Sequence, residues 1–205
     1  MRRFRMLALG ASVLALVLSA CSTGGGSSSS ASASKPKVII GSANFYESAL
    51  VGEIYAQALE AKGFTVDRKF NFGTRALTNA ALKSGQLNLM PEYIGSDAST
   101  LKATATGDPQ ATFAALKAVL DPLGLTALNF ALLQDDKQSQ GADNMVPVLR
   151  KDLLAAGGST LSDTLNAISA KLTTDALTQM GVKVDVNKDN PATVAKQFLQ
   201  DNSLI

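Results

Sequence analysis

Three short segments of this sequence together hold aromatic rings, carboxylates and small residues. Tyr46 and Tyr93 are two of the chain's three tyrosines, and Glu47 and Glu92 stand directly beside them. An aromatic face attracts a cation with about 0.5–2 kcal/mol per contact, and a quaternary ammonium depends on this attraction because it has no N–H to donate. These residue types therefore predict a site for a cationic small molecule. The segments are Ser42–Glu47, Phe72–Thr74 and Pro91–Gly95.

The residues around these segments predict the elements that position them. Val38–Ile40 reads as a short buried strand, and period-two alternation predicts two further strands over residues 64–70 and 87–89. Apolar residues at helical spacing predict helices between them, over residues 50–59 and 77–81. This order is typical of an α/β fold with parallel strands and right-handed crossovers. Ligands bind beyond the carboxyl ends of such strands, where all three segments lie.

The second half of the chain predicts more helices and further extended segments. Asp108 followed by Pro109 marks a helix start. Residues 125–133 are apolar and expected to be extended, and Met145–Leu149 is expected to be a strand that Pro147 places near an edge of the sheet. Further helices are expected over residues 161–168, from a cap at Thr173 or Thr174 to Gly181, and after Asn190 and Pro191.

Each candidate site residue also has a structural interpretation. Phe45 is either a packing residue of the core or hinge or a wall of an aromatic cage, and for Tyr46 packing and ligand contact are equally open. Tyr93, which follows a strand and precedes Gly95, favours ligand contact. Glu47 is expected to cap the first helix. Thr74 follows a glycine turn and can cap the second helix, and the amides of that helix start would suit a ligand carboxylate.

The composition excludes several function classes. The chain has no histidine and a single cysteine, so neither a Ser-His-Asp triad nor a histidine zinc site can form. No motif for paired catalytic carboxylates or a Ser-Lys dyad is visible. We therefore expect no enzyme, no cofactor and no metal. The absence of a basic run and the small aromatic content argue against a nucleic-acid partner.

The N-terminus predicts export and anchoring. Three arginines precede an apolar run of 13 residues, Met6–Leu18, which is shorter than the ~20 residues of a membrane span but suits a secretory signal. Leu18–Cys21 (LSAC) resembles a lipoprotein lipobox, which implies cleavage after residue 20 and diacylation of Cys21. Residues 22–35 form a Gly/Ser-rich tether that reaches ~20 Å. The alternative is an ordinary cleaved signal with a cysteine beside the cut. Without the three signal arginines, 16 basic residues face 17 acidic ones.

The same segments resemble the substrate-binding lipoproteins of ABC importers for glycine betaine, choline and related osmoprotectants. The opening GS-x-NF-x-E and the motif PEY-x-G are both present, and the similarity continues through DDKQSQGADNMVPVLRKDLL and PATVAKQFLQDNSLI. The resemblance implies that Tyr93 belongs to an aromatic cage and that Asn44, Phe45 and Thr74 line the pocket. It also implies a quaternary-ammonium ligand, an ABC permease as partner, and a location on the outer face of the cytoplasmic membrane.

One departure from the family pattern concerns the number of lobes. Family members have two α/β lobes, of the type II periplasmic-binding-protein fold, and the ligand is clamped between them. Here the outgoing segment ends near residue 130 and the returning one begins near 133. We therefore expect a single lobe over residues 36–205, built from 36–130 and 133–205, with a mostly parallel sheet flanked by helices. A lobe on the order of 100 residues is expected to be missing near 129–135.

The missing lobe divides the expected function into two alternatives. The first is solute capture for an importer with weakened binding, because losing two or three aromatic contacts at ~1 kcal/mol each costs one to several factors of ten in affinity. The second is a lipid-anchored single-lobe interaction module that no longer carries solute. Unaltered affinity for the permease without any osmolyte binding would separate the two.

Overall fold

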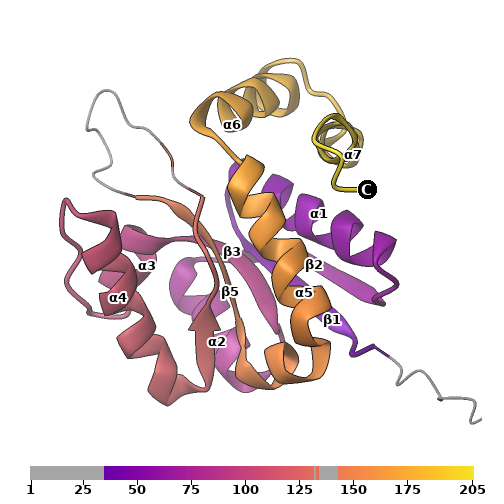
Figure 1. Cartoon of the computed structure of the whole chain (residues 1–205). Helices are drawn as coiled ribbons and strands as arrows, with labels where there is room; N and C mark the ends of the chain where they lie inside the picture. The colour runs from indigo at the N-terminus through magenta and orange to yellow at the C-terminus, as the bar shows by residue number, and fades with distance from the viewer. Residues whose placement is uncertain (1–34, 132, 134–142) are drawn as a thin grey trace, which may run out of the picture. The chain divides into compact units, whose positions relative to one another are not determined.

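The computed structural model describes residues 35–131, 133 and 143–205. The predicted signal, Cys21 and almost all of the tether lie outside the described residues, as do residues 132, 134 and 135 of the predicted lobe junction. The described strands form one mixed sheet in the order β2-β1-β3-β5-β4 (Figure 1). Their bounds are β1 (Val38–Ala43), β2 (Val66–Gly73), β3 (Leu89–Tyr93), β4 (Leu125–Ala127) and β5 (Met145–Arg150).

The first half of the sheet is parallel, as predicted. β1 pairs in parallel with β2 on one side and with β3 on the other. The connections are the helices α1 (Tyr46–Ala61) and α2 (Arg75–Ser84), so the predicted strand–helix–strand–helix–strand order is confirmed. Because these three strands run the same way, the segments that follow them meet at one edge of the sheet.

The second half of the sheet reverses direction at β5. This strand pairs antiparallel with both β3 and β4, and Pro147 lies opposite Pro91. Pro147 was expected near an edge, and β5 is indeed next to the three-residue edge strand β4. The β4–β5 register ends at Ala127 and Val148, beyond which the Leu128 N–H donates to the Pro147 carbonyl over 3.1 Å. The proline, which has no N–H, therefore serves the sheet there as an acceptor only.

Five more α-helices, a short 3-10 helix (Asp121–Leu123) and a π-helical turn (Val182–Val186) complete the described part of the chain. Three of them begin at the caps that the sequence predicts: Asp108 accepts from the Gln110 N–H, Thr173 from Ala176 and Asn190 from Ala192. The longest helix begins at Lys151, ten residues before the helix predicted over residues 161–168, and contains a kink at Gly158, where φ is 59°. The helices are α3 (Ile94–Thr100), α4 (Pro109–Leu120), α5 (Lys151–Lys171), α6 (Thr174–Gly181) and α7 (Pro191–Asp201).

Two apolar clusters cover the two faces of the sheet. Successive strand residues point to opposite faces, so Leu89 belongs to one cluster and Met90 to the other. The first cluster joins the sheet to α1, α5, α6 and α7, and the second joins it to α2, α3 and α4 (Figure 1). The α/β class with helices on both faces is therefore confirmed. None of the helices in the described ranges is long and apolar enough to span a membrane.

Candidate ligand-binding site

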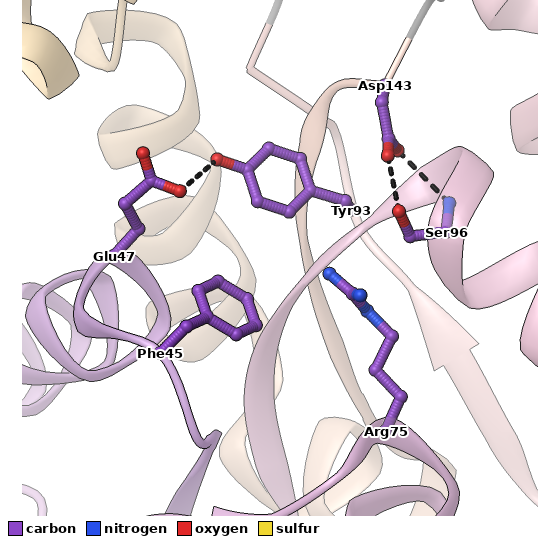
Figure 2. Close-up of a pocket in the computed structure, with 6 residues that line it drawn as sticks. All are labelled: Phe45, Glu47, Arg75, Tyr93, Ser96 and Asp143. Atoms are coloured by element: carbon purple, nitrogen blue, oxygen red, sulfur yellow. Dashed lines mark hydrogen bonds between the residues drawn. The ribbon is translucent and has the colours of Figure 1, made fainter. Parts of the chain in front are cut away.

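A pocket of about 480 Å³ opens at the edge of the sheet where β1 and β3 end. Figure 2 shows its lining side chains, which come from segments far apart in the sequence. Two follow β1, one begins α2, two lie where β3 passes into α3, and one precedes β5. This is the edge at which the sequence predicted a site. The lining residues are Phe45, Glu47, Arg75, Tyr93, Ser96 and Asp143.

The centre of the pocket is a stacked aromatic pair. The rings of Phe45 and Tyr93 have centroids 6.3 Å apart and planes inclined by 25°. Tyr93 is 9% exposed, and its phenol donates a hydrogen bond of 3.0 Å to Oε2 of Glu47. Burial raises the pKa of Tyr93 far above its usual range, and the Glu47 carboxylate adds to this effect. Tyr93 is therefore a neutral donor at any physiological pH.

Glu47 does not have the role that the sequence suggested. The N-cap of α1 is Phe45, which makes no side-chain cap hydrogen bond, and Glu47 lies in the first turn. Glu47 instead accepts two phenol hydrogen bonds, from Tyr93 on Oε2 and from Tyr46 on Oε1 over 3.1 Å. The expected helix cap is thus wrong, because the carboxylate is taken up by two phenols and not by a cap hydrogen bond at the helix start. The result is a carboxylate fixed beside the aromatic pair, which favours a cation.

A guanidinium lies against the same aromatic pair. The Cζ atom of Arg75 is 5.2 Å from the centroid of the Phe45 ring. Its Nε donates over 2.8 Å to Oε2 of Glu92, which is fully buried and also accepts from the Tyr93 N–H over 3.1 Å. The pKa of Glu92 is raised to about 7, chiefly by burial and also by the neighbouring Asp97, although the Arg75 guanidinium opposes both. Arg75 thus lines one wall of the pocket as a charged side chain, and the buried Glu92 holds it from the interior.

Behind that wall, three buried acceptor atoms have no hydrogen-bond partner within the described ranges. They are Oε1 of Glu92, Oδ2 of Asp97 and Oδ1 of Asn79. The Asn79 amide donates over 2.6 Å to the other oxygen of Asp97. Burial raises the pKa of Asp97 to about 6, even though the Asn79 hydrogen bond lowers it. Buried acceptors without donors are costly, and a proton held by one of these carboxyls near neutral pH reduces that cost.

The opposite wall is a capped helix start. Asp143 accepts from the Gly95 N–H over 2.7 Å and from the Ser96 N–H over 3.2 Å with one oxygen, and from the Ser96 hydroxyl over 2.5 Å with the other. Two free N–H groups in the first turn of α3 are thereby satisfied by a carboxylate from a distant segment. Asp143 therefore fixes Ser96 in the pocket wall.

The structure brings only some of the predicted site residues into this pocket. Phe45 and Tyr93 line it. Tyr46 is 40% exposed and lies against α6, where a Cβ at Gly181 would come within 2.8 Å of its hydroxyl. Asn44 and Thr74 are exposed at the ends of β1 and β2, outside the lining set. Thr74 is the N-cap of α2 by position, but its side chain makes no cap hydrogen bond. Ligand contact by Asn44, Tyr46 or Thr74 stays a prediction.

Three lining residues were not predicted, namely Arg75, Ser96 and Asp143. The signal for Arg75 was its place directly after Thr74, at the first turn of a helix whose start had been located. Asp143 lies two residues before the strand Met145–Leu149, but that strand's direction was not known from the sequence. Among the described residues, no group of three or more acidic or cysteine side chains could hold a metal ion.

Comparison with known proteins identifies the family. Residues 36–119 and 122–201 match the family model of the substrate-binding domain of ABC-type glycine betaine transport systems. The chain belongs to this family. Its members are solute-binding proteins of ABC importers, as the sequence motifs predicted.

Individual relatives agree with this assignment. The glycine betaine-binding protein YehZ of Escherichia coli (strain K12) is 38% identical over 65 residues, which cover 32% of this chain and 21% of that protein. The match therefore spans about a fifth of this curated relative. The solved structure of apo YehZ from E. coli has a TM-score of 0.72 at 16% identity, over 82% of this chain and 99% of that one.

A second solved structure, a glycine betaine/carnitine/choline ABC transporter protein, also has a TM-score of 0.72 at 16% identity, over 83% of this chain and 99% of that one. At such identities the two solved structures establish the fold alone. The predicted fold of ABC-importer solute-binding proteins is thereby confirmed.

Proposed function

We propose that this chain is the lipid-anchored substrate-binding component of an ABC importer for quaternary-ammonium osmoprotectants. Glycine betaine, choline and carnitine are the candidate ligands, and the partner is a permease in the cytoplasmic membrane. The observation that carries the proposal is the stacked Phe45–Tyr93 pair with the Glu47 carboxylate 3.0 Å from the Tyr93 phenol. Family membership and the names of the two related proteins support the same ligand class.

The chemistry of the pocket suits a cation that has no N–H. An aromatic face contributes about 0.5–2 kcal/mol to such a ligand, and more when water is excluded. The Glu47 carboxylate adds a negative charge beside the Tyr93 ring. Because both its oxygens already accept phenol hydrogen bonds, Glu47 is held in place before a ligand arrives, and little conformational entropy has to be lost on binding.

Binding by this chain alone is expected to be weak. The described residues form one sheet, which supports the single lobe expected from the sequence. A single lobe offers one aromatic pair and leaves the opposite side of a ligand in water, so its affinity lies one to several factors of ten below that of a closed cage. The anchor at Cys21 and the tether behind it keep this weak binder concentrated at the membrane surface, close to its permease.

Calorimetric titration of the full chain in a mild detergent tests the proposal. Glycine betaine, proline betaine, carnitine and choline are titrated into the wild type and into Tyr93→Ala, with thermal unfolding recorded for both proteins. Binding in the wild type and none in a folded Tyr93→Ala supports solute capture. A folded wild type that binds none of the four contradicts it. If that protein still associates with the permease, the alternative of a single-lobe interaction module gains the support.

A further inference from the structure

The face of the Phe45 ring, a natural place for a cationic ligand, is already in contact with a cation of the chain itself. The guanidinium carbon of Arg75 lies 5.2 Å from the ring centroid, within the range of a cation–π contact. Figure 2 shows the Arg75 side chain reaching up beside the Phe45 and Tyr93 rings. A ring face that holds one cation is not free for a second.

Arg75 is held in this position from two sides. Its backbone starts α2, so the side chain leaves from a fixed point beside the pocket. Its Nε donates to Oε2 of Glu92 over 2.8 Å, and that oxygen also accepts from the Tyr93 N–H. The Glu92 side chain is fully buried, whereas that of Arg75 is 27% exposed. Glu92 therefore ties the base of the guanidinium to the strand that carries Tyr93.

We propose that Arg75 is a built-in competitor for cations: its guanidinium fills the Phe45 ring face and thereby lowers the affinity of the pocket for a cationic ligand. This inference rests on the proposed function and adds a specificity-determining residue to it. Two unit charges of like sign about 6 Å apart, at an effective dielectric constant of roughly 40, change an affinity on the order of tenfold. Release of the ring face adds to that change in the same direction.

The inference also ranks ligands by their charge. Tetramethylammonium and choline carry only the positive charge, so no group of their own offsets the repulsion from Arg75. Glycine betaine is a zwitterion, and its carboxylate is attracted by the same guanidinium. Arg75 therefore shifts the preference of the pocket from plain cations towards zwitterions, and its removal should help the plain cations more.

The test compares two variants that remove one positive charge beside an aromatic ring. Arg75→Gln removes it in the pocket. Lys117→Gln is the matched control, because the Lys117 ammonium lies 5.5 Å from the Phe113 ring centroid on α4, outside the lining residues. Tetramethylammonium chloride, choline and glycine betaine are titrated calorimetrically into the full chain in a mild detergent.

We expect Arg75→Gln to bind tetramethylammonium and choline about 5–20-fold more tightly than the wild type, consistent with the charge estimate above. The gain for glycine betaine should be smaller, and Lys117→Gln should bind like the wild type. The inference is overturned if Arg75→Gln binds tetramethylammonium no more tightly than the wild type does. If the wild type binds glycine betaine in the same experiment, the proposed function still stands.

A second measurement needs no ligand. In ¹⁵N-labelled wild type, the ring current of Phe45 should shift the Arg75 Nε–H proton signal upfield, and Phe45→Leu should abolish the shift. A signal at the ordinary arginine position that Phe45→Leu does not move overturns the occupancy of the ring face. If the upfield shift is present but neither the wild type nor either glutamine variant binds any of the three ligands, occupancy of the Phe45 ring face is supported. The proposed function is then contradicted.

Discussion

The Tyr93 phenol donates its hydrogen bond to Oε2 of Glu47, which joins the last residue of β3 to the first turn of α1. The other oxygen of Glu47 accepts from Tyr46. One carboxylate thus accepts hydrogen bonds from a buried phenol and from an exposed one, since Tyr93 is 9% exposed and Tyr46 is 40% exposed. The phenol oxygen can therefore be removed from Tyr93 or from Tyr46, and the effects of the two substitutions can be compared.

Tyr93→Phe should destabilise the chain more than Tyr46→Phe. Loss of a mostly buried hydrogen bond to a charged group costs roughly 1.5–3 kcal/mol, whereas water replaces a bond lost at an exposed site and the cost stays below about 1 kcal/mol. Urea unfolding of the two variants measures the difference. Tyr93→Phe should also weaken ligand binding, because Glu47 loses its partner inside the pocket. Equal losses of stability would contradict this account of the Tyr93–Glu47 bond.

The buried carboxyl of Glu92 should give the stability of the protein an unusual dependence on pH. Its pKa is raised from 4.5 to about 7 in the folded chain, chiefly by burial, so the folded state binds the proton more tightly than the unfolded state. The stabilisation is complete below about pH 4.5 and is lost as the pH rises through about 7. Asp97, whose pKa is raised to about 6 by burial, acts in the same direction. The loss amounts to roughly 3 kcal/mol for Glu92.

Glu92→Gln should flatten this decline in the free energy of unfolding between pH 4.5 and 8, since glutamine still accepts from Arg75 and cannot ionise. Urea unfolding at several pH values measures the slope. Glu60→Gln is the control, because Glu60 also pairs with an arginine, Arg68, but its side chain is 40% exposed. A Glu92→Gln protein with the slope of the wild type would show that another group causes the decline.

The parallel half of the fold could be predicted because its signals are local. The alternation in residues 64–70 and the apolar stripe of α1 mark a strand and a helix without any tertiary information. The helix starts at Asp108 and Asn190 are equally local, because each cap residue accepts a hydrogen bond from an N–H two residues further along the chain. The direction of β5 could not be predicted in this way. A short apolar strand with a proline carries no signal for its orientation, which is set by pairing with β3 and β4.

The site could be predicted only as far as its segments follow parallel strands. Phe45 and Tyr93 were found because each belongs to a segment that follows a predicted strand. Asp143 precedes a strand, and it reaches the same edge only because β5 runs in reverse. The misassigned role of Glu47 has a similar cause, since a carboxylate in a first helical turn favours capping until a phenol from another strand lies within reach.

Cys21 should carry the lipid that anchors the chain, a prediction that rests on the sequence motif LSAC. Cells grown with a clickable palmitate analogue should incorporate it into the wild-type chain and not into Cys21→Ser. Because a single cysteine is present, any thiol-linked label must sit at this position. Mass spectrometry of the mature N-terminus gives the second measurement, and a chain that begins at Cys21 without acyl groups would favour the ordinary cleaved signal instead.

Asp143→Ala should weaken both the fold and the site, because Asp143 accepts from the Gly95 and Ser96 N–H groups of α3 and fixes the Ser96 hydroxyl in the pocket wall. Loss of a side-chain cap of this kind costs about 0.5–2 kcal/mol. Asp108→Ala is a matched control, since Asp108 caps α4 by accepting from the Gln110 N–H away from the pocket. Urea unfolding should show similar losses for both variants.

Titration with glycine betaine then separates their effects on binding. Asp143→Ala should lose several-fold in affinity because Ser96 is released from its position, and Asp108→Ala should bind like the wild type. Asp143→Asn keeps one acceptor oxygen for the α3 amides and should fall between Asp143→Ala and the wild type in stability. If Asp143→Ala bound glycine betaine as the wild type does, Asp143 would hold α3 in place without shaping the pocket.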